Sequence, residues 1–510
     1  MAEGAAAAVR QRIERPRLVA APRILRGALA AEEDPFAACL DPSRLRVVAD
    51  ASRLAPGQLA DLAALAAAFG VRLVLCGGAS AGGLPPEALA ALAAEHDAPL
   101  LLPPGAPEPL PPPPEPGPAI GAITLHRIAL PLRHLYVSAM YVRRAQPRVL
   151  VQIRLADGTE GWGEAPGGEE IARLAGALAR SWLGRHPLGE RAALRRAFAR
   201  TAFDNRNGRN GLAAFAALDL AAWDASARLL GLPLAALLGH AAPPPPVPVA
   251  APLPAAAPPA GAEDRASLAR HMAEAGNAGR VAALAEEMAD RHGIAAFKWK
   301  STGQDPAWDE AAMSALRRRL GAAARLRHDP NGAFAPDEAL EVAERLSPLA
   351  LEFLEDPTDG LEAMARLSAR IETPIATNMA ILSAADLAAR YRRGAGPQIV
   401  LGDIFYWGGI AGLRDMALVA RRIGLTPALH SFYESAVATA ANAHLAAALG
   451  LASPHPMDCG TPGLLADVVP EGVLRIEKGH LHAPAGPGLG LSPDPTLLRH
   501  LATAEPETIA

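Results

Sequence analysis

Residues 295–302 read AAFKWKST, a short apolar run with two lysines at its end, and five later segments repeat this design. Each run ends in a polar or charged cluster and is followed by a stretch rich in Ala, Leu and Arg. The later runs are RLRHDPN (325–331), LEFLEDP (351–357), PIATNM (374–379), QIVLGDIF (398–405) and TPALHSF (426–432). Their polar tips recur at about 23 to 31 residues, close to the length of one βα unit. The pattern predicts an α/β fold built on a TIM barrel.

The composition gives no sign of a charged macromolecular partner. The 49 Lys and Arg residues nearly balance the 53 Asp and Glu residues, for a net charge of −4, so neither nucleic acid nor a membrane surface is expected as a partner. Cys39, Cys76 and Cys459 fit neither a zinc spacing nor a disulfide framework. The sequence contains no recognisable signal peptide and no apolar run of about 18 residues. We therefore expect a cytoplasmic protein.

Proline clusters divide the chain, because proline lacks an amide donor and keeps its neighbours extended. We expect a small α/β segment of unknown role over residues 1–102, a proline-rich linker over 103–119, an α+β unit over 120–240 and the barrel over 241–500. The first segment alternates strand-like and helix-like runs in the order βαβαβ, which predicts a small parallel sheet. Its CGGASAGG stretch lacks the Lys-Ser/Thr pair of a phosphate loop, so a turn is favoured there.

Lys298 and Lys300 end the first of the six strands. Side chains alternate along a strand, so both lysines share one face, while Phe297 and Trp299 point toward the helices. A Lys-x-Lys pair taken alone is usually a solvated surface feature. The large apolar flanks argue against that reading and place two ammonium groups at the barrel mouth.

Three oxygen-bearing side chains end the next three strands: Asp329 in DPNG, Glu355 in LEDP and Asn378 in ATNM. Taken singly, DPNG is typical of a type I turn and EDP of an acidic helix start. Hard oxygen ligands from adjacent strand ends suit Mg²⁺, which keeps its other positions for water and substrate. In register with the lysines, the three residues predict a magnesium site.

Asp403 and His430 end the last two strands of the series. A carboxylate beside an imidazole fixes its tautomer and raises its basicity, which prepares a histidine for proton transfer near neutrality. A lone histidine at a strand end is more often a satisfied structural residue. We assign that structural role to His328, because alternation points it away from the mouth.

The order Lys-x-Lys, Asp, Glu, Asn, Asp, His on successive strands resembles the enolase superfamily of mandelate racemase and muconate lactonizing enzymes, and in particular its glucarate dehydratase-like acid sugar dehydratases. The resemblance runs from about residue 120 to about residue 500. It also includes DGTEGWGE, LLGLPLAALLG, DIFYWGG and GPGLGLSPD. It implies a modified (β/α)₇β barrel over 241–500 and an α+β capping domain over 120–240.

The resemblance also implies the roles of the site residues. Lys300 and His430 would be the acid/base groups on opposite sides of the substrate, Lys298 would assist Lys300, and Asp403 would orient His430. The ligands of Mg²⁺ would be Asp329, Glu355 and Asn378. The expected reaction removes the proton beside a carboxylate and then expels water, which gives a 2-keto-3-deoxy sugar acid. The expected partner is a small acid sugar, and a homo-oligomer is expected.

Some features depart from the dehydratase pattern. His430 is followed by SFYESA instead of a polar, asparagine-containing stretch, which leaves the sugar acid open, and FKWK is followed by STG instead of the usual glycines. Residues before 120 have no counterpart in the family. Racemisation or epimerisation with the same two bases stays an alternative. A catalytically inactive barrel that acts as a scaffold through its N-terminal segment is another.

Overall fold

The computed structural model describes residues 46–50, 72–76, 100–101, 117–187, 190, 194, 198, 208–240, 243–258, 274–393 and 396–510. The chain forms two compact units. The smaller contains residues 1–116 with the helical segments Ser383–Arg392 and Leu418–Ile423, and the larger contains the rest. Most of the proposed linker lies outside the described residues.

The smaller unit contains a parallel sheet of three strands. β1 (Arg46–Asp50) pairs with β2 (Arg72–Cys76), and β2 pairs with β3 (Leu100–Leu101). This sheet confirms the parallel arrangement predicted from the alternating pattern. The helices expected between its strands lie outside the described residues.

The larger unit contains a run of eight parallel strands in the spatial order β14-β7-β8-β9-β10-β11-β12-β13, and its end strands β13 and β14 contact each other. The strands are β7 (Val247–Leu253), β8 (Ala296–Lys300), β9 (Arg325–Asp329), β10 (Phe353–Glu355), β11 (Ile375–Thr377), β12 (Ile399–Gly402), β13 (Thr426–Leu429) and β14 (Met457–Asp458). All six strands predicted from the repeating runs are confirmed.

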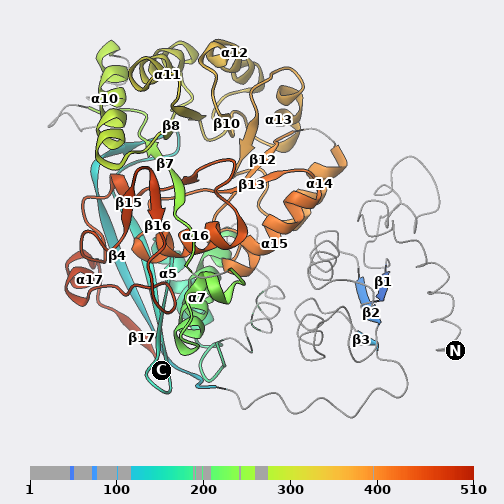
Figure 1. The fold of residues 1–510 in the computed structure, drawn as a ribbon, viewed down its shortest axis with the longest axis vertical. Helices are drawn as coiled ribbons and strands as arrows, with labels where there is room; N and C mark the ends of the chain where they lie inside the picture. The colour runs from blue at the N-terminus through green and yellow to red at the C-terminus, as the bar shows by residue number, and fades with distance from the viewer. Residues whose placement is uncertain are drawn as a thin grey trace, which may run out of the picture. The chain divides into compact units, whose positions relative to one another are not determined.

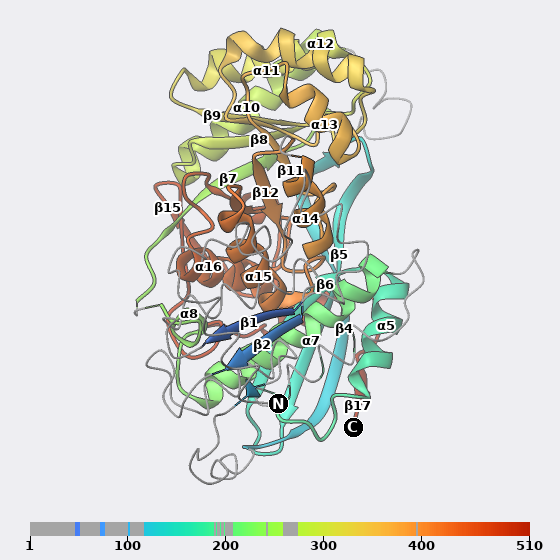
Figure 2. The same cartoon turned by 90° about the vertical axis from the view of Figure 1, so that its right-hand side faces the viewer.

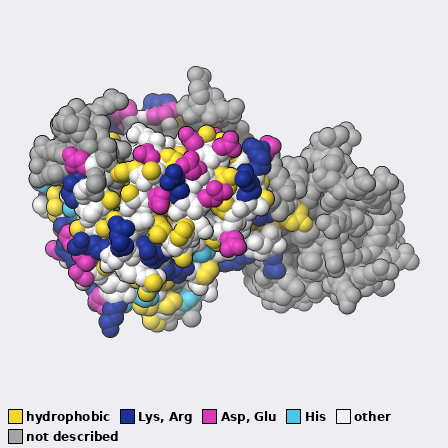
Figure 3. All heavy atoms as spheres, turned by 90° about the horizontal axis from the view of Figure 1, so that it is seen from above, with side chains coloured by type: hydrophobic (Ala, Val, Ile, Leu, Met, Phe, Trp, Pro, Cys, Tyr) yellow, Lys and Arg dark blue, Asp and Glu magenta, His cyan; other side chains and the backbone are white. Residues whose placement is uncertain are grey.

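Seven helices alternate with these eight described strands along the chain, which is the (β/α)₇β order. They are α10 (Ala275–His292), α11 (Pro306–Leu320), α12 (Pro336–Leu346), α13 (Leu361–Ser368), α14 (Ala384–Arg393), α15 (Gly409–Arg422) and α16 (Ala436–Leu449). In Figure 1, α10 to α13 lie outside the strands. On the described part of the face in Figure 3, basic and acidic side chains are interspersed.

The inner face of the strand run is divided between apolar and charged side chains. Alternation places the residue two positions before each polar strand end on the same face as that end. On β10 to β13 these positions contribute to one buried apolar cluster, made by Phe353, Ala376, Ile399, Leu401 and Ala428. On β8 and β9 they are charged instead. The buried charges of the inner face are therefore concentrated on β8 and β9.

The capping part is an antiparallel sheet in the order β17-β4-β5-β6. Its strands are β4 (Ile120–Val137), β5 (Val142–Leu155), β6 (Glu160–Pro166) and β17 (Glu507–Ile509). Figure 2 shows these strands beside α5 (Glu169–Ala179) and α7 (Gly208–Leu229). The pairing of β17 with β4 returns the last residues of the chain to the capping sheet, which the sequence pattern did not predict.

The glycines of GWGE allow α7 to pack directly on β6. A Cβ atom at Gly163 would lie 1.9 Å from the carbonyl oxygen of Ala217, and one at Gly161 would lie 2.2 Å from that of Ala221. Because both oxygens belong to the backbone of α7, no side-chain rotation can relieve the clash. The packing of α7 on β6 therefore requires both glycines of the motif. The last residue, Glu164, has a different role.

We expect Gly163→Ala to lower the free energy of unfolding by about 1 to 3 kcal/mol, because the helix must move off the sheet. Gly279→Ala is the matched control, since its Cβ would meet nothing within 4 Å in the interior of α10. There alanine should stabilise the helix by about 0.5 to 1 kcal/mol. Urea unfolding of both variants measures the difference, and equal effects at the two positions would contradict the packing account.

Candidate active site

The seven predicted site residues all lie at or just beyond the carboxyl ends of β8 to β13, and all are buried. Their exposed fractions are 0% for Lys298, 5% for Lys300, 0% for Asp329, 0% for Glu355, 6% for Asn378, 1% for Asp403 and 2% for His430. At such low exposure, these groups are closed off from solvent by the surrounding segments. The capping loop after β4 is one such segment, since Ala139 donates its backbone N–H to the carbonyl of Ser301, 3.1 Å away.

The two lysines each pair with a predicted metal ligand. Lys298 Nζ lies 3.1 and 3.0 Å from the two carboxylate oxygens of Glu355 and 3.9 Å from Asp329 Oδ2. Lys300 Nζ donates to Asp329. Burial alone would raise the pKa of Asp329, but the ammonium groups of Lys300 and Lys298 lower it below its usual value. Burial and the nearby charge of Asp329 hold the pKa of Glu355 well above its usual range.

Asn378 joins this cluster through its side chain and its backbone. Its Nδ2 donates to Glu355 Oε1 at 3.1 Å, and its backbone N–H donates to Asp356 Oδ2 at 2.9 Å. Asp356 has a φ of 39°, a left-handed conformation that is uncommon for a residue other than glycine. Its carboxylate also accepts from Thr377 Oγ1. Asp356 therefore links the end of β10, which carries Glu355, to the end of β11, which carries Asn378. The sequence pattern did not predict this role.

His430 lies beside the carboxylates without a hydrogen bond. Its Nε2 is 3.7 Å from Glu355 Oε1, and neither ring nitrogen has a hydrogen-bond partner among the described residues. Burial, followed by the charges of Lys298, Lys300 and Arg209, holds its pKa well below the usual value. The ring of Phe432 packs edge-on against the imidazole, with the centroids 4.3 Å apart.

Asp403 makes no described hydrogen bond to His430. Its Oδ1 accepts from the backbone N–H groups of Phe405 and Tyr406, at 2.9 and 2.7 Å. Burial raises the pKa of Asp403 to about 6. The carboxylate thus stabilises its own turn, and its predicted role in orienting His430 stays a prediction.

His328 faces the helices, as alternation predicts. Its Nε2 lies 2.7 Å from Asp309 Oδ2 on α11, and the same oxygen accepts from Ser301 Oγ at 2.6 Å. Its ring is also tilted against that of Trp299, 5.8 Å away. These contacts are structural, and they lie on the side of the strands that faces the helices and not on the side that faces the barrel interior.

The segment SFYES, after His430, is fixed to the capping sheet by buried charges. Glu164 accepts from the backbone N–H and Oγ of Ser435 at 3.0 and 2.6 Å, at the N-terminus of α16. Arg148 pairs with Glu164 at 3.1 Å and donates to the carbonyls of Phe432 and Tyr433. Burial raises the pKa of Glu164 to about 7, against the effect of Arg148. The last residue of GWGE thus holds the cap next to the histidine loop.

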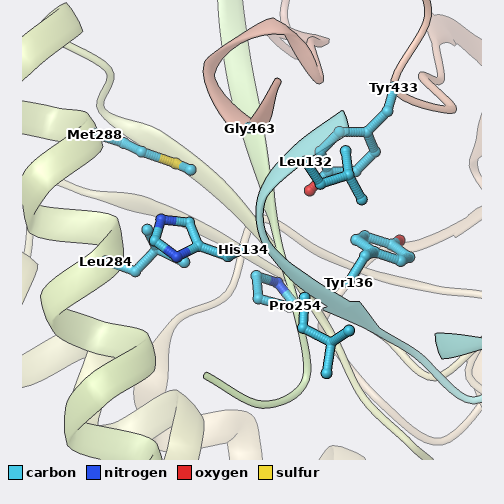
Figure 4. Close-up of a pocket in the computed structure, with 9 residues that line it drawn as sticks. Leu132, His134, Tyr136, Pro254, Leu284, Met288, Tyr433 and Gly463 are labelled. Atoms are coloured by element: carbon cyan, nitrogen blue, oxygen red, sulfur yellow. The ribbon is translucent and has the colours of Figure 1, made fainter. Parts of the chain in front are cut away.

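A small cavity lies beside the mouth, between the end of β4 and α10 (Figure 4). Its volume of about 10 Å³ leaves room for no more than one water molecule. The residues lining it are Leu132, His134, Leu135, Tyr136, Pro254, Leu284, Met288, Tyr433 and Gly463. None of the seven predicted site residues lines it, so it is a packing gap next to the site.

Comparisons with known proteins agree with this geometry. The N-terminal domain model of mandelate racemase and muconate lactonizing enzyme matches residues 122–239, and the enolase C-terminal domain-like model matches residues 280–497. A protein of Streptomyces coelicolor named "Probable glucarate dehydratase" is 31% identical over 366 residues, which cover 68% of this chain and 83% of that protein. The chain belongs to the enolase superfamily.

Other members of the superfamily carry different reaction names. The L-Ala-D/L-Glu epimerase of Bacillus subtilis is 25% identical over 383 residues, which cover 72% of this chain and 95% of that protein. A solved enolase of Pseudomonas fluorescens with bound magnesium, potassium and tartrate has a TM-score of 0.66 and 27% identity, and the match covers 75% of this chain and 92% of that one. Superfamily membership therefore fixes the fold and leaves the reaction open. None of the described helices is long and apolar enough to cross a membrane.

The residues of this superfamily member fit a divalent cation. Among the described residues, no three His, Cys, Asp or Glu side chains are arranged to hold a metal ion, but the predicted set contains two carboxylates and one amide. Asp329 and Glu355 are buried, and both lie within 4 Å of Lys298 Nζ. Two buried carboxylates so close together favour a cation between them, and hard oxygens suit Mg²⁺. Asn378 would bind it through its side-chain oxygen.

Two charged residues of the barrel interior were not predicted from the sequence. Asp458 ends β14 with 1% exposure and accepts from Lys298. Arg327 donates to the other oxygen of Asp458 at 2.8 Å and to Glu352 at 2.8 Å. Arg327 stands two positions before Asp329, so alternation alone could have placed it inside. Asp458 is the last residue of a strand of only two residues, and no apolar run marks it in the sequence.

Proposed function

We propose that this enolase superfamily member is a Mg²⁺-dependent hydro-lyase that removes the proton beside the carboxylate of a sugar acid and expels the neighbouring hydroxyl. One observation carries the proposal. Two groups capable of proton transfer, Lys300 and His430, each lie against one of two buried carboxylates, with Lys300 on Asp329 and His430 3.7 Å from Glu355. These contacts support a proton donor or acceptor beside each of the two carboxylates that we propose as metal ligands.

The scarcity of lysine supports this role. The sequence contains three lysines, Lys298, Lys300 and Lys478, and every other one of its 49 basic residues is arginine. Arginine would supply the same charge, but it does not release its proton near neutrality. Two lysines at adjacent inward positions of the mouth therefore favour proton transfer over charge alone.

The charge of the pocket favours an acidic substrate. Lys298, Lys300 and, from the N-terminal end of α7, Arg209 all act on His430 as positive charges. The guanidinium of Arg209 lies over the ring of Tyr406, 4.4 Å from its centroid. With a divalent cation bound, these charges together exceed the negative charges of Asp329 and Glu355, and an excess of positive charge attracts anions. The class proposed is a polyhydroxy acid, as the dehydratase name of the Streptomyces coelicolor relative suggests.

The residues of the chain account for the proton movements. Two routes balance. Either neutral His430 accepts the proton when the α C–H bond breaks and then donates it to the β-hydroxyl as the C–O bond breaks, or Lys300 in its neutral form accepts the α proton and a protonated His430 donates another. In both routes water leaves. The enol that remains becomes the 2-keto-3-deoxy acid. Bound Mg²⁺ would supply positive charge that stabilises the carboxylate as its negative charge increases. Lys298 adds to this charge from the side of Glu355.

Incubation with a panel of mono- and diacid sugars in Mg²⁺ buffer made with D₂O tests the proposal. The account predicts a semicarbazide-reactive keto acid. Deuterium at the α-carbon without keto acid would favour epimerisation instead, which uses the same two groups and has a precedent in the epimerase relative. Neither product from any acid sugar would favour the scaffold alternative.

Asp403→Asn tests the remaining site prediction. Asparagine keeps an oxygen acceptor for the N–H groups of Phe405 and Tyr406, so the free energy of unfolding should change by less than about 1 kcal/mol. If the carboxylate orients His430 during the reaction, kcat should fall by about 10- to 100-fold. Steady-state kinetics beside urea unfolding separates the two effects, and unchanged kcat would leave Asp403 as a turn residue only.

A further inference from the structure

Asp458 belongs to a chain of buried ion pairs that runs from Lys298 through Asp458 and Arg327 to Glu352. One of its carboxylate oxygens accepts from Lys298, and the other accepts from Arg327 Nη1 at 2.8 Å. Arg327 in turn donates to Glu352, also at 2.8 Å, and to the carbonyl of Pro456. All polar atoms of the Asp458 carboxylate are therefore engaged by cations, and none of the described contacts joins it to Asp329 or Glu355.

Lys298 lies among three carboxylates, of which a cation would need two. Its ammonium is 3.0 Å from Glu355, 3.9 Å from Asp329 and in contact with Asp458. A divalent cation on Asp329 and Glu355 would bind the oxygens that Lys298 now contacts, so the two would compete for them. The cation and the ammonium would also repel each other, strongly so at short range in a buried site. Asp458 is the one partner that Lys298 can keep when the cation is bound.

We propose that Asp458 is a positioning residue that sets the affinity of the site for its divalent cation, because it neutralises Lys298 and keeps that ammonium from competing for Asp329 and Glu355. This inference rests on the metal dependence in the proposed function. It goes further by assigning a role to a residue on β14 that need not touch metal or substrate. Outer partners of metal sites typically change affinity by about 10- to 100-fold when they are replaced.

Titration of Mn²⁺ into the full-length, EDTA-treated protein, followed by electron paramagnetic resonance of the free ion, measures this affinity without turnover. Asp458→Asn should bind Mn²⁺ about 10- to 100-fold more weakly than the wild type. Asp224→Asn is the matched control. Asp224 is also a buried carboxylate, but it lies on α7 and binds Arg228 and the backbone N–H groups of Trp162 and Leu489, none of which is a predicted site residue. Its replacement should leave Mn²⁺ binding unchanged.

A double variant separates the charge effect from general disruption. Lys298→Met combined with Asp458→Asn removes the competing ammonium together with its partner, so Mn²⁺ affinity should return toward that of the wild type. Equal weakening in the single and double variants would overturn the proposal, as would an Asp458→Asn variant with normal affinity. Where Asp458→Asn does not fold, Lys298→Met alone decides: tighter binding than the wild type supports the proposal, and equal or weaker binding overturns it.

The experiment also distinguishes this inference from the proposed function. If the wild-type protein binds no Mn²⁺, both the metal site and the proposed reaction are ruled out. A wild type that binds Mn²⁺ together with an unaffected Asp458→Asn variant would remove the role of Asp458 alone.

Discussion

Lys300→Met is expected to lower kcat by about 10²- to 10⁴-fold, the usual contribution of a positioned acid or base. Methionine is similar in length and keeps the apolar packing of the side chain, but it can neither carry nor transfer a proton. It also removes the hydrogen bond that the Lys300 ammonium now donates to Asp329. Steady-state kinetics on the substrate found in the acid-sugar panel, with Mg²⁺ saturating, measures the change.

Two further variants make this test specific. Lys300→Arg keeps the positive charge, but a guanidinium does not lose its proton near neutral pH, so the variant should lose nearly as much activity as Lys300→Met if proton transfer is the role. Lys478→Met alters the one lysine outside the site and should leave kcat unchanged. Near-normal activity in Lys300→Arg would mean that the lysine contributes only charge.

Glu355→Gln is expected to weaken divalent-metal binding by more than about 100-fold, since even the outer partners of a metal site are worth about 10- to 100-fold. Glutamine keeps the shape of the side chain and removes one of the two negative charges that would balance Mg²⁺. Turnover at millimolar Mg²⁺ should be lost in parallel. Isothermal titration with Mg²⁺ or Mn²⁺ measures the binding.

The matched control for this variant is Glu164→Gln. Glu164 is equally buried and ion-paired, but its contacts to Arg148 and Ser435 join the cap to α16 and do not reach the metal position. We expect a loss of unfolding free energy with metal affinity nearly unchanged. Normal metal binding by Glu355→Gln, or equal losses in both variants, would contradict the assignment of Glu355 as a ligand.

The barrel could be predicted because its strands are apolar runs with polar ends at a regular spacing. Lys298 and Lys300 lie on the inner face of the strands. Trp299 and His328 lie on the face toward the helices, as the two-residue period of a strand requires. The same period places Arg327 inside beside Asp329. Local sequence periodicity thus determines which side chains reach the mouth.

Residues outside this periodicity could not be placed. Asp458 ends a two-residue strand that follows the segment SPHP, and Asp356 acts through a left-handed turn that no pattern marks. The attachment of Glu164 to Ser435 joins positions 271 residues apart. Such contacts depend on how the cap packs against the barrel. That packing leaves no regular spacing in the sequence from which it could be predicted.

The most direct test of the account is a crystal structure of the full-length protein after EDTA treatment and soaking in Mn²⁺, with anomalous diffraction to locate the metal. The account predicts one anomalous peak at the carboxyl ends of β9 to β11, within about 2.0 to 2.3 Å of oxygens of Asp329, Glu355 and Asn378. A protein without an ordered Mn²⁺, or with Mn²⁺ bound only away from these three side chains, would contradict it.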